Sequence, residues 1–243
     1  MERSLIHPLP VHVHNDVYLW DFRSLSMVST NIKGNQLILH PEKAAYWPAE
    51  KALLLSDLHL GKGAHFRRAG IAVPSAVSGA NFSRLLSLIK LFKPARVLFL
   101  GDLFHSDYNQ VWPLFCAFTH EHAEVSFELI PGNHDILPAA AYQEARMIRQ
   151  PEILTIGNLS LSHHPLSDQE RPTGTYNIYG HIHPCVRLLD ATGNSLRLPA
   201  FFFGEKGGIL PAFGEFTGCA EVKARLGDQV FVLVEGEVVE ASV

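Results

Sequence analysis

The sequence predicts an α/β (α+β) protein built as a two-sheet β-sandwich flanked by helices. Short apolar runs alternate with stretches of helical spacing in the first half, whereas strands and turns alone fill the part after Gly180. The 243 residues contain no internal repeat, low-complexity tract or convincing linker, which suits one domain. We expect this domain to span residues 27–243, with the Pro- and His-rich residues 1–26 as an N-terminal extension outside the core.

Six short apolar runs suit buried strands, and each except the first leads directly into polar residues. They are "QLILH" (36–40), "ALLLS" (52–56), "RVLFL" (96–100), "SFELI" (126–130), "LSLS" (159–162) and "YNIYG" (176–180).

Three stretches between these runs have the spacing of helices. Apolar residues recur at helical spacing from Phe82 to Phe92, until Pro94 ends the run. Similar patterns run from Val111 to Phe118 and, more weakly, from 139 to 147. After Gly180, "VRLLD" and "SLRLPAFFF" flank the turn "ATGN", and "QVFVLVEG" leads into "EVVEA". Antiparallel strands should therefore dominate the second half.

Charge and cysteine content narrow the function class and the compartment. Lys and Arg number 20 against 24 acidic residues, so that any contact with nucleic acid has to be local. Cys116, Cys185 and Cys219 are odd in number and lack a CxxC pair, which argues against a disulfide framework or a thiolate zinc site. The apolar runs are too short to span a membrane, and the N-terminus does not resemble a signal peptide. We expect a cytoplasmic protein with reduced cysteines.

Metal-ligating residue types follow five of the predicted strands. They occur in "SDLH", "GDLFH", "GNHD", "SHHP" and "GHIH". Because the carboxyl ends of strands line the ligand crevice of open α/β sheets, these five loops should converge. Carboxylate, imidazole and amide oxygen suit Mn²⁺, Fe²⁺ or Zn²⁺. Seven candidate ligands are enough for two ions: Asp57, His59, Asp102, Asn133, His163, His181 and His183.

A pair of ions at this rim favours phosphate chemistry. Two divalent ions bring about +4 of charge against two aspartates, so the site would attract an anionic phosphate. The ions would also lower the pKa of water and stabilise charge on phosphoryl oxygens. Asp102 is the natural bridging ligand, because it lies between the ligand sets in chain order. We expect His134 to give a proton to the leaving oxygen and Asp135 to fix the tautomer of His134.

The pattern DxH, GDxxH, GNHD, H and GHxH resembles that of calcineurin-like metallophosphoesterases, over about residues 51–185. The resemblance implies the fold of that family and two ion sites that have one ligand, Asp102, in common. His163 is preferred to His164 because the family's histidine stands two places before Pro, with His164 as the fallback. His164 and His105 are otherwise expected to orient ligands. By the resemblance, Asp57, His59, Asp102 and His183 hold one ion, and Asp102, Asn133, His163 and His181 hold the other, with His134 acting on the leaving group.

Two longer strings, "SDLHLGKGAHFRRAGIAVP" and "LPAFGEFTGC", resemble a narrower branch, the DNA-ligase-associated metallophosphoesterases. This resemblance implies a Mn²⁺-dependent phosphodiesterase or single-strand endonuclease in bacterial DNA repair, with an ATP-dependent DNA ligase and a helicase as partners. "TGC" departs from the two glycines expected there. The cations and aromatic residue that suit phosphate contacts and base stacking are Lys62, His65, Phe66, Arg67 and Arg68, which alone would also fit an ordinary solvated loop.

Two other functions are compatible with parts of the pattern. The same ions could hydrolyse a nucleotide-type small molecule, because an open site admits polymers and small esters alike. A non-catalytic interaction scaffold is disfavoured, since none of the expected ligands is missing. The sequence does not distinguish endonuclease from exonuclease cleavage, or a monomer from a homodimer.

Overall fold

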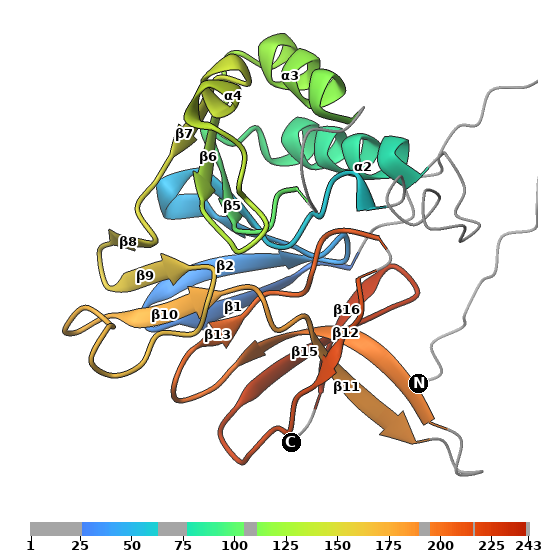
Figure 1. Ribbon diagram of the computed structural model, residues 1–243. Helices are drawn as coiled ribbons and strands as arrows, with labels where there is room; N and C mark the ends of the chain where they lie inside the picture. The colour runs from blue at the N-terminus through green and yellow to red at the C-terminus, as the bar shows by residue number, and fades with distance from the viewer. Residues whose placement is uncertain (1–25, 63–76, 105–110, 190–194, 216, 242–243) are drawn as a thin grey trace, which may run out of the picture.

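Two β-sheets pack face to face, and α-helices cover the outer face of the first (Figure 1). The computed structural model describes residues 26–62, 77–104, 111–189, 195–215 and 217–241. The predicted α/β class and two-sheet arrangement are confirmed. Among the residues described, no helix is long and apolar enough to cross a membrane. The N-terminal extension lies outside the described residues except for Ser26.

The first sheet has seven strands in chain order. β1 to β4 are antiparallel neighbours, whereas β4 to β7 run parallel. The parallel half therefore brings the carboxyl ends of successive strands to one edge. The strands are β1 (Val28–Ile32), β2 (Asn35–His40), β3 (Ala44–Trp47), β4 (Ala52–Leu55), β5 (Arg96–Leu100), β6 (Ser126–Ile130) and β7 (Met147–Arg149), with a short 3₁₀ turn, η1 (Pro48–Glu50), before β4.

Within the described residues, the helices that connect the parallel strands are α2 (Val77–Phe92), α3 (Val111–Glu121) and α4 (Ala139–Glu144). Successive residues of the parallel strands point to opposite faces of this sheet, and both sets are largely apolar, so each face must be covered. In β4, Leu53 and Leu55 face the helices, whereas Leu54 faces the second sheet. The continuous apolar runs of the sequence are thus strands buried between a helical layer and a second sheet.

The second sheet has nine strands, and its central order is β14-β11-β12-β13-β10-β9-β8, with β15 and β16 continuing from β12. β9, β10 and β13 run parallel, and the hairpins after Gly180 are antiparallel as predicted. The strands are β8 (Ile153–Ile156), β9 (Leu159–Ser162), β10 (Tyr176–Tyr179), β11 (Pro184–Leu189), β12 (Ser195–Phe203), β13 (Gly208–Ile209), β14 (Ala220–Glu221), β15 (Gln229–Val234) and β16 (Glu237–Ala241).

The expectation that all cysteines are unpaired is wrong. Cys185 and Cys219 form a disulfide with a Cα–Cα distance of 5.7 Å, and Cys116 is free and buried. The pairing arises because β11 and the two-residue strand β14 run side by side, with Cys185 opposite Glu221. Their separation of 34 residues gave no hint of this contact.

Candidate metal centre

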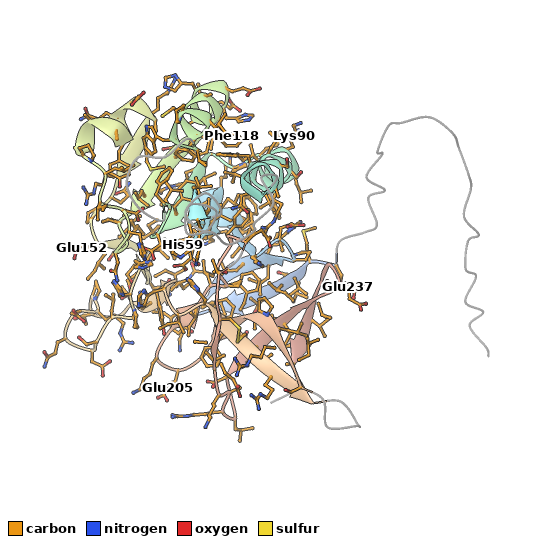
Figure 2. All side chains as sticks on the ribbon, turned by 45° about the vertical axis from the view of Figure 1, so that its right-hand side comes forward. His59, Lys90, Phe118, Glu152, Glu205 and Glu237 are labelled. Atoms are coloured by element: carbon orange, nitrogen blue, oxygen red, sulfur yellow. A yellow bond between two sulfur atoms is a disulfide. The ribbon has the colours of Figure 1, made fainter. Side chains whose placement is uncertain are left out.

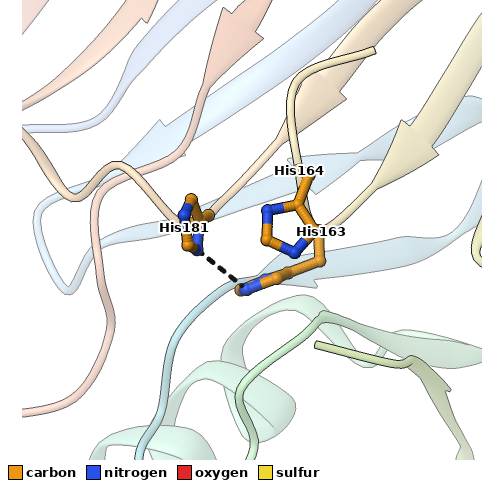
Figure 3. A group of neighbouring side chains, drawn as sticks. All are labelled: His163, His164 and His181. Carbon is orange, nitrogen blue, oxygen red and sulfur yellow. Dashed lines mark hydrogen bonds between the residues drawn. The ribbon is translucent and has the colours of Figure 1, made fainter. Parts of the chain in front are cut away.

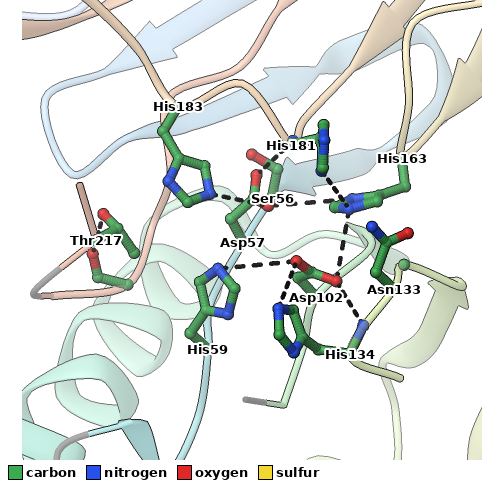
Figure 4. A network of polar contacts seen from close by, with 12 residues as sticks. Ser56, Asp57, His59, Asp102, Asn133, His134, His163, His181, His183 and Thr217 are labelled. Carbon is green, nitrogen blue, oxygen red and sulfur yellow. Dashed lines mark hydrogen bonds and ion pairs between the residues drawn. The ribbon is translucent and has the colours of Figure 1, made fainter. Parts of the chain in front are cut away.

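The five predicted loops meet at one rim, and both sheets contribute to it. Asp57 and Asp102 follow β4 and β5 of the first sheet, whereas His163 and His181 follow β9 and β10 of the second. Figure 4 shows their side chains converging from these loops. The site therefore lies where the ends of two packed sheets meet, rather than at the edge of a single sheet.

The backbone of this rim adopts an uncommon conformation. Asp57, His59, Asp102, His181 and His183 all have φ between 46° and 64°, in the left-handed region. Such non-glycine residues cost about 1–3 kcal/mol each and cluster at functional sites. Five of the seven candidate ligands share this feature, which supports a site held in place by the surrounding fold.

Close backbone packing joins the ligand loops. A Cβ atom on Gly101 would lie 2.2 Å from His163 Nδ1, and one on Gly180 would lie 2.6 Å from Asp57 Oδ2. The amide of His181 donates to Asp57 Oδ2 at 3.0 Å. Glycine is required at both positions because a side chain would displace a candidate ligand.

The first ligand cluster contains Asp57, His59 and His183, whose ligand atoms lie within 4.8 Å of one another. Asp57 Oδ1 lies 3.2 Å from His183 Nε2. This oxygen is buried and makes no hydrogen bond of good geometry within the described residues. A buried carboxylate oxygen aimed at two imidazoles is the environment that a cation would complete.

The second cluster contains His163, His164 and His181, whose ligand atoms lie within 4.8 Å of one another. His181 Nδ1 lies 3.2 Å from His163 Nε2, and Figure 3 shows the exposed ring of His164 beside both. His164 Nε2 lies 2.6 Å from Asn133 Oδ1. The structure thus gives His164 a place next to a ligand, on the solvent side of the cluster.

Asp102 lies between the clusters, with one carboxylate oxygen facing each. Its Oδ2 is 3.8 Å from His59 Nε2, and its Oδ1 is 3.5 Å from His163 Nε2. The amide of His134 donates to Oδ1 at 3.0 Å. This is the placement expected of a bridging carboxylate.

Backbone carbonyls hold two imidazole ligands in position. His163 Nδ1 lies 3.0 Å from the carbonyl of Leu100, and His183 Nδ1 lies 3.0 Å from the carbonyl of Gly218. A proton on each Nδ1 would leave Nε2 as the metal-binding atom. Both Nε2 atoms face the candidate ligand carboxylates.

Burial and charge set the protonation of the ligands. Burial lowers the pKa of His59 to about 4, although Asp102 and Asp57 oppose this shift. Burial would raise the pKa of Asp57, but the close contact with His183 Nε2 and the charges of His183 and His163 hold it below its ordinary value. Neutral imidazole and ionised carboxylate are the forms that bind metal. Conversely, although burial opposes it, the Asp57 contact raises the pKa of His183, so a proton and a metal ion would compete for its Nε2.

A C-terminal segment lies directly against the first cluster; we call residues 211–215 and 217–220 the strap. The amides of Phe213 and Gly214 donate to the carbonyls of Ser56 and Asp57 at 2.8 and 3.0 Å. Gly218 accepts from His183, and the Cys185–Cys219 disulfide closes the far end. The strings "SDLH" and "LPAFGEFTGC" are therefore neighbours in space as well as markers of a resemblance.

Arg84 of α2 anchors the near end of the strap. Its guanidinium donates to the Phe213 carbonyl at 3.0 Å and to Glu215 Oε1 at 2.8 Å. It also lies 4.2 Å from the Phe213 ring centroid and forms an ion pair with Glu42. Sequence reasoning missed this residue, because one arginine on an amphipathic helix carries no signal of a distant partner.

Asp135 has a different role from the one expected. Its Oδ2 accepts from the Gly132 amide at 2.8 Å, and its Oδ1 accepts from the Leu103 amide at 3.0 Å. Both oxygens therefore accept from backbone amides and join two ligand loops. The expected role of Asp135 was instead to hold the ring of His134. Burial raises the pKa of Asp135 to about 6, against the effect of these hydrogen bonds.

His134 lies at the mouth of the site. Its side chain is 44% exposed, and its Nε2 lies 4.0 Å from Asp102 Oδ2. Lys62 is also nearby. Burial lowers its pKa below the ordinary value, and the charges of Asp102 and Asp57 offset part of this shift. The other residues proposed to contact substrate or ligands lie outside the described residues, namely His65, Phe66, Arg67, Arg68 and His105.

The donor set, the unsatisfied Asp57 oxygen and the central Asp102 all fit two divalent ions. A comparison with protein families agrees, because the model of the calcineurin-like phosphoesterases matches residues 51–204, more than half of the chain. The chain belongs to the calcineurin-like phosphoesterase family. It is accordingly a metal-dependent phosphoesterase, a hydrolase of a family that uses divalent metal ions.

Solved structures add a nuclease to the relatives of this phosphoesterase. Pseudomonas putida nuclease MPE is 26% identical with a TM-score of 0.75, covering 89% of this chain and 100% of its own. The E. coli phosphoesterase Yfce is 13% identical with a TM-score of 0.38, covering 76% of this chain and 88% of its own. A conserved uncharacterized protein from Streptococcus pneumoniae TIGR4, a predicted phosphoesterase, is 13% identical with a TM-score of 0.32. The match covers 79% of this chain and 97% of that protein. No curated protein matches the chain.

Proposed function

We propose that this phosphoesterase is a nuclease that hydrolyses phosphodiester bonds of single-stranded DNA with two Mn²⁺ ions. The observation that carries the proposal is the similarity to Pseudomonas putida nuclease MPE along that protein's whole length. The two strings typical of the ligase-associated branch support it further, since within their described parts the amides of Phe213 and Gly214 bind the carbonyls of Ser56 and Asp57 at the metal centre. The proposal includes a role in DNA repair beside an ATP-dependent ligase and a helicase.

The chain's own residues divide the work of the site. Asp57, His59 and His183 would hold one ion, and Asn133, His163 and His181 the other, with Asp102 shared. When bound, two such ions lower the pKa of water and neutralise charge on the phosphoryl oxygens. Their ligands are anchored by backbone carbonyls and amides, so the site is formed before the substrate arrives.

His134 is the group we assign to the leaving oxygen. Its ring is partly exposed, and its Nε2 faces the clusters near Asp102. A proton held at this Nε2 can be given to the departing alkoxide, which avoids a high-energy anion. The ring of His134 also lies with His59 and Asp102 in a group whose ligand atoms are within 4.8 Å of one another. Because the family resemblance assigns His134 to the leaving group and to neither ion, replacing it should slow turnover without releasing metal.

Cleavage of circular single-stranded DNA in the presence of Mn²⁺ tests the proposal. The expected result is linear and then shorter DNA, abolished by chelation and restored by Mn²⁺. Hydrolysis of bis-p-nitrophenyl phosphate is measured in parallel. Rapid hydrolysis of the small ester with intact DNA would overturn the nuclease assignment in favour of a small-molecule phosphodiesterase. If neither the DNA nor the small ester is hydrolysed, the protein is not a catalyst for phosphodiester hydrolysis.

The variant His134→Ala sharpens the same experiment. We expect turnover to fall by about 10²-fold or more. Manganese content, measured after gel filtration, should stay at the wild-type level, which Asp102→Ala should not achieve. Full activity of His134→Ala would remove this residue from the mechanism.

The proposed repair role places the enzyme in the cytoplasm, where disulfides are rare. The Cys185–Cys219 bond would then meet a reducing environment. Counting free thiols in protein isolated from cells under acid quench would show which state is present there.

A further inference from the structure

A second cavity lies apart from the metal centre. It has a volume of about 630 Å³ and is lined by the β1–β2 turn, β10, the turn after β12 and the loop before β15. Glu205 lies on its rim, and Figure 2 places this residue well away from His59. Neither cluster of candidate metal ligands lines it.

Positive charge gathers around this cavity in an otherwise acidic chain. Lys33, Lys206, Lys223 and Arg225 line it and are exposed. In the described parts of the chain, no ion pair of a lysine or arginine includes any of the four. Four cations therefore face a cavity with two acidic residues, while the whole chain has a net charge of −4. A cavity with these unpaired charges favours an anionic ligand.

Aromatic rings form another part of the cavity wall. Tyr176 is fixed in place, because its hydroxyl donates to the Gly204 carbonyl at 2.8 Å. The ammonium group of Lys33 lies 5.6 Å from the centroid of this ring. Tyr179 and Phe202 are only partly buried. Rings beside cations are the combination that holds the base and phosphate of a nucleotide.

We propose that the cavity binds a nucleotide unit of the substrate strand, with its phosphate against the lysines and arginine and its base against Tyr179 or Phe202. β10 connects the cavity to the metal centre, because His181 stands two residues after the end of this strand at Tyr179. At a rise of about 3.3 Å per residue, Tyr179 lies about 7 Å and Tyr176 about 16 Å from His181 along the chain. A phosphate held beside Lys33 at the Tyr176 end is therefore a different phosphate from the one at the metal centre, and a strand would join the two. The link to cleavage rests on the proposed nuclease function, but binding itself does not.

Charge reversal in the cavity tests the proposal. The triple variant Lys206→Glu/Lys223→Glu/Arg225→Glu is compared with Lys90→Glu/Lys93→Glu/Arg146→Glu, which makes the same charge change at exposed positions outside the cavity. Binding of a fluorescent phosphorothioate oligothymidylate, which resists cleavage, is followed by anisotropy. The cavity variant should bind at least tenfold more weakly, and its salt dependence (log K against log salt) should fall by about 2, from three lost contacts at ~0.7 each. The control variant should keep the wild-type slope.

Two further arms identify the ligand. Tyr179→Leu and Phe202→Leu should weaken binding without changing the salt dependence, because they remove stacking and leave the charges. Competition with thymidine monophosphate separates two sources of the same chemistry. Displacement by the mononucleotide indicates a free nucleotide, and displacement only by oligonucleotide indicates a strand.

Equal weakening in both triple variants, or in neither, would overturn the proposal. Hydrolysis of bis-p-nitrophenyl phosphate is measured on every variant, so damage to the metal centre is detected separately. If wild-type protein binds the oligonucleotide through the cavity but cleaves no DNA, the proposed function fails and the cavity stands. If it cleaves DNA while the cavity variant binds normally, the cavity fails and the function stands.

Discussion

Opening the Cys185–Cys219 disulfide should weaken both the fold and the metal centre. The bond closes a loop of 34 residues, for which the chain-entropy relation gives about 4 kcal/mol of stability. It also holds the strap, whose Gly218 carbonyl positions His183. Losing such a partner of a ligand typically lowers metal affinity by about 10- to 100-fold. We therefore expect Cys219→Ser to lose about 4 kcal/mol in urea unfolding and at least tenfold in Mn²⁺ affinity by calorimetry.

Chemical controls make this test decisive. Reduction by a dithiol converts the disulfide into two thiols as the reductant forms its own disulfide, and it should reproduce both effects in wild-type protein. Cys116→Ala changes a buried cysteine outside the strap and should leave Mn²⁺ affinity unaltered. Under denaturing, non-reducing conditions we expect one free thiol per chain. Three free thiols, or unchanged Mn²⁺ affinity after reduction, would refute the reasoning.

Other contacts give predictions of different kinds. Asp102→Ala should remove both ions and all hydrolysis, because this carboxylate faces both clusters; normal metal content by elemental analysis would contradict the bridge. Asp135→Ala leaves the amides of two ligand loops without their acceptor, and should cost about 3 kcal/mol in urea unfolding, whereas an unchanged midpoint would exclude this role. Arg84→Met keeps the stem of the side chain but releases the strap, so limited proteolysis should cut within residues 211–220; resistance equal to wild type would speak against the anchor.

His40 should make stability depend on pH. Its Nδ1 accepts from the Glu42 amide at 3.1 Å, and burial lowers its pKa to about 4, with Glu42 opposing. The unfolded chain therefore binds more protons between about pH 6.5 and 4, so the contribution is complete above this window and is lost as pH falls through it. The loss should be about 3 kcal/mol at most, measured as the difference from His40→Asn. Parallel pH profiles for both proteins would show that His40 is not responsible.

The buried strands and their polar ends were predictable from the sequence. β4 and β5 carry apolar residues on both faces, and β6 does so apart from the buried Glu128, so their runs stand out without any knowledge of neighbours. The motifs after them follow the chain locally, and convergence at a rim is a general property of such sheets. That two sheets share the rim was not visible, since nothing in the local pattern states how the sheets pack.

Weaker elements and long-range contacts were missed for physical reasons. β1 and β8 are half-exposed and short, so that their alternation resembles that of loops. β14 has two residues, yet it creates the disulfide by pairing with β11. Asp135 follows His134 in sequence, which suggested a contact, but its carboxylate accepts from the Gly132 amide of its own loop and from the Leu103 amide of the loop after β5. Such partners depend on tertiary geometry rather than on spacing.

Because the candidate ligands are divided between two sheets, the packing between the sheets determines how the two sets of ligands are placed relative to each other. Asp57, Asp102 and Asn133 supply every oxygen ligand from the first sheet, whereas the second supplies imidazoles alone. Metal binding would thus fasten the two layers together, and the stability that it adds would rise with the logarithm of the ion concentration. Small cavities made between the layers, as by Leu161→Ala, would then shift one ligand set against the other. Catalysis would decline at temperatures where the chain is still folded.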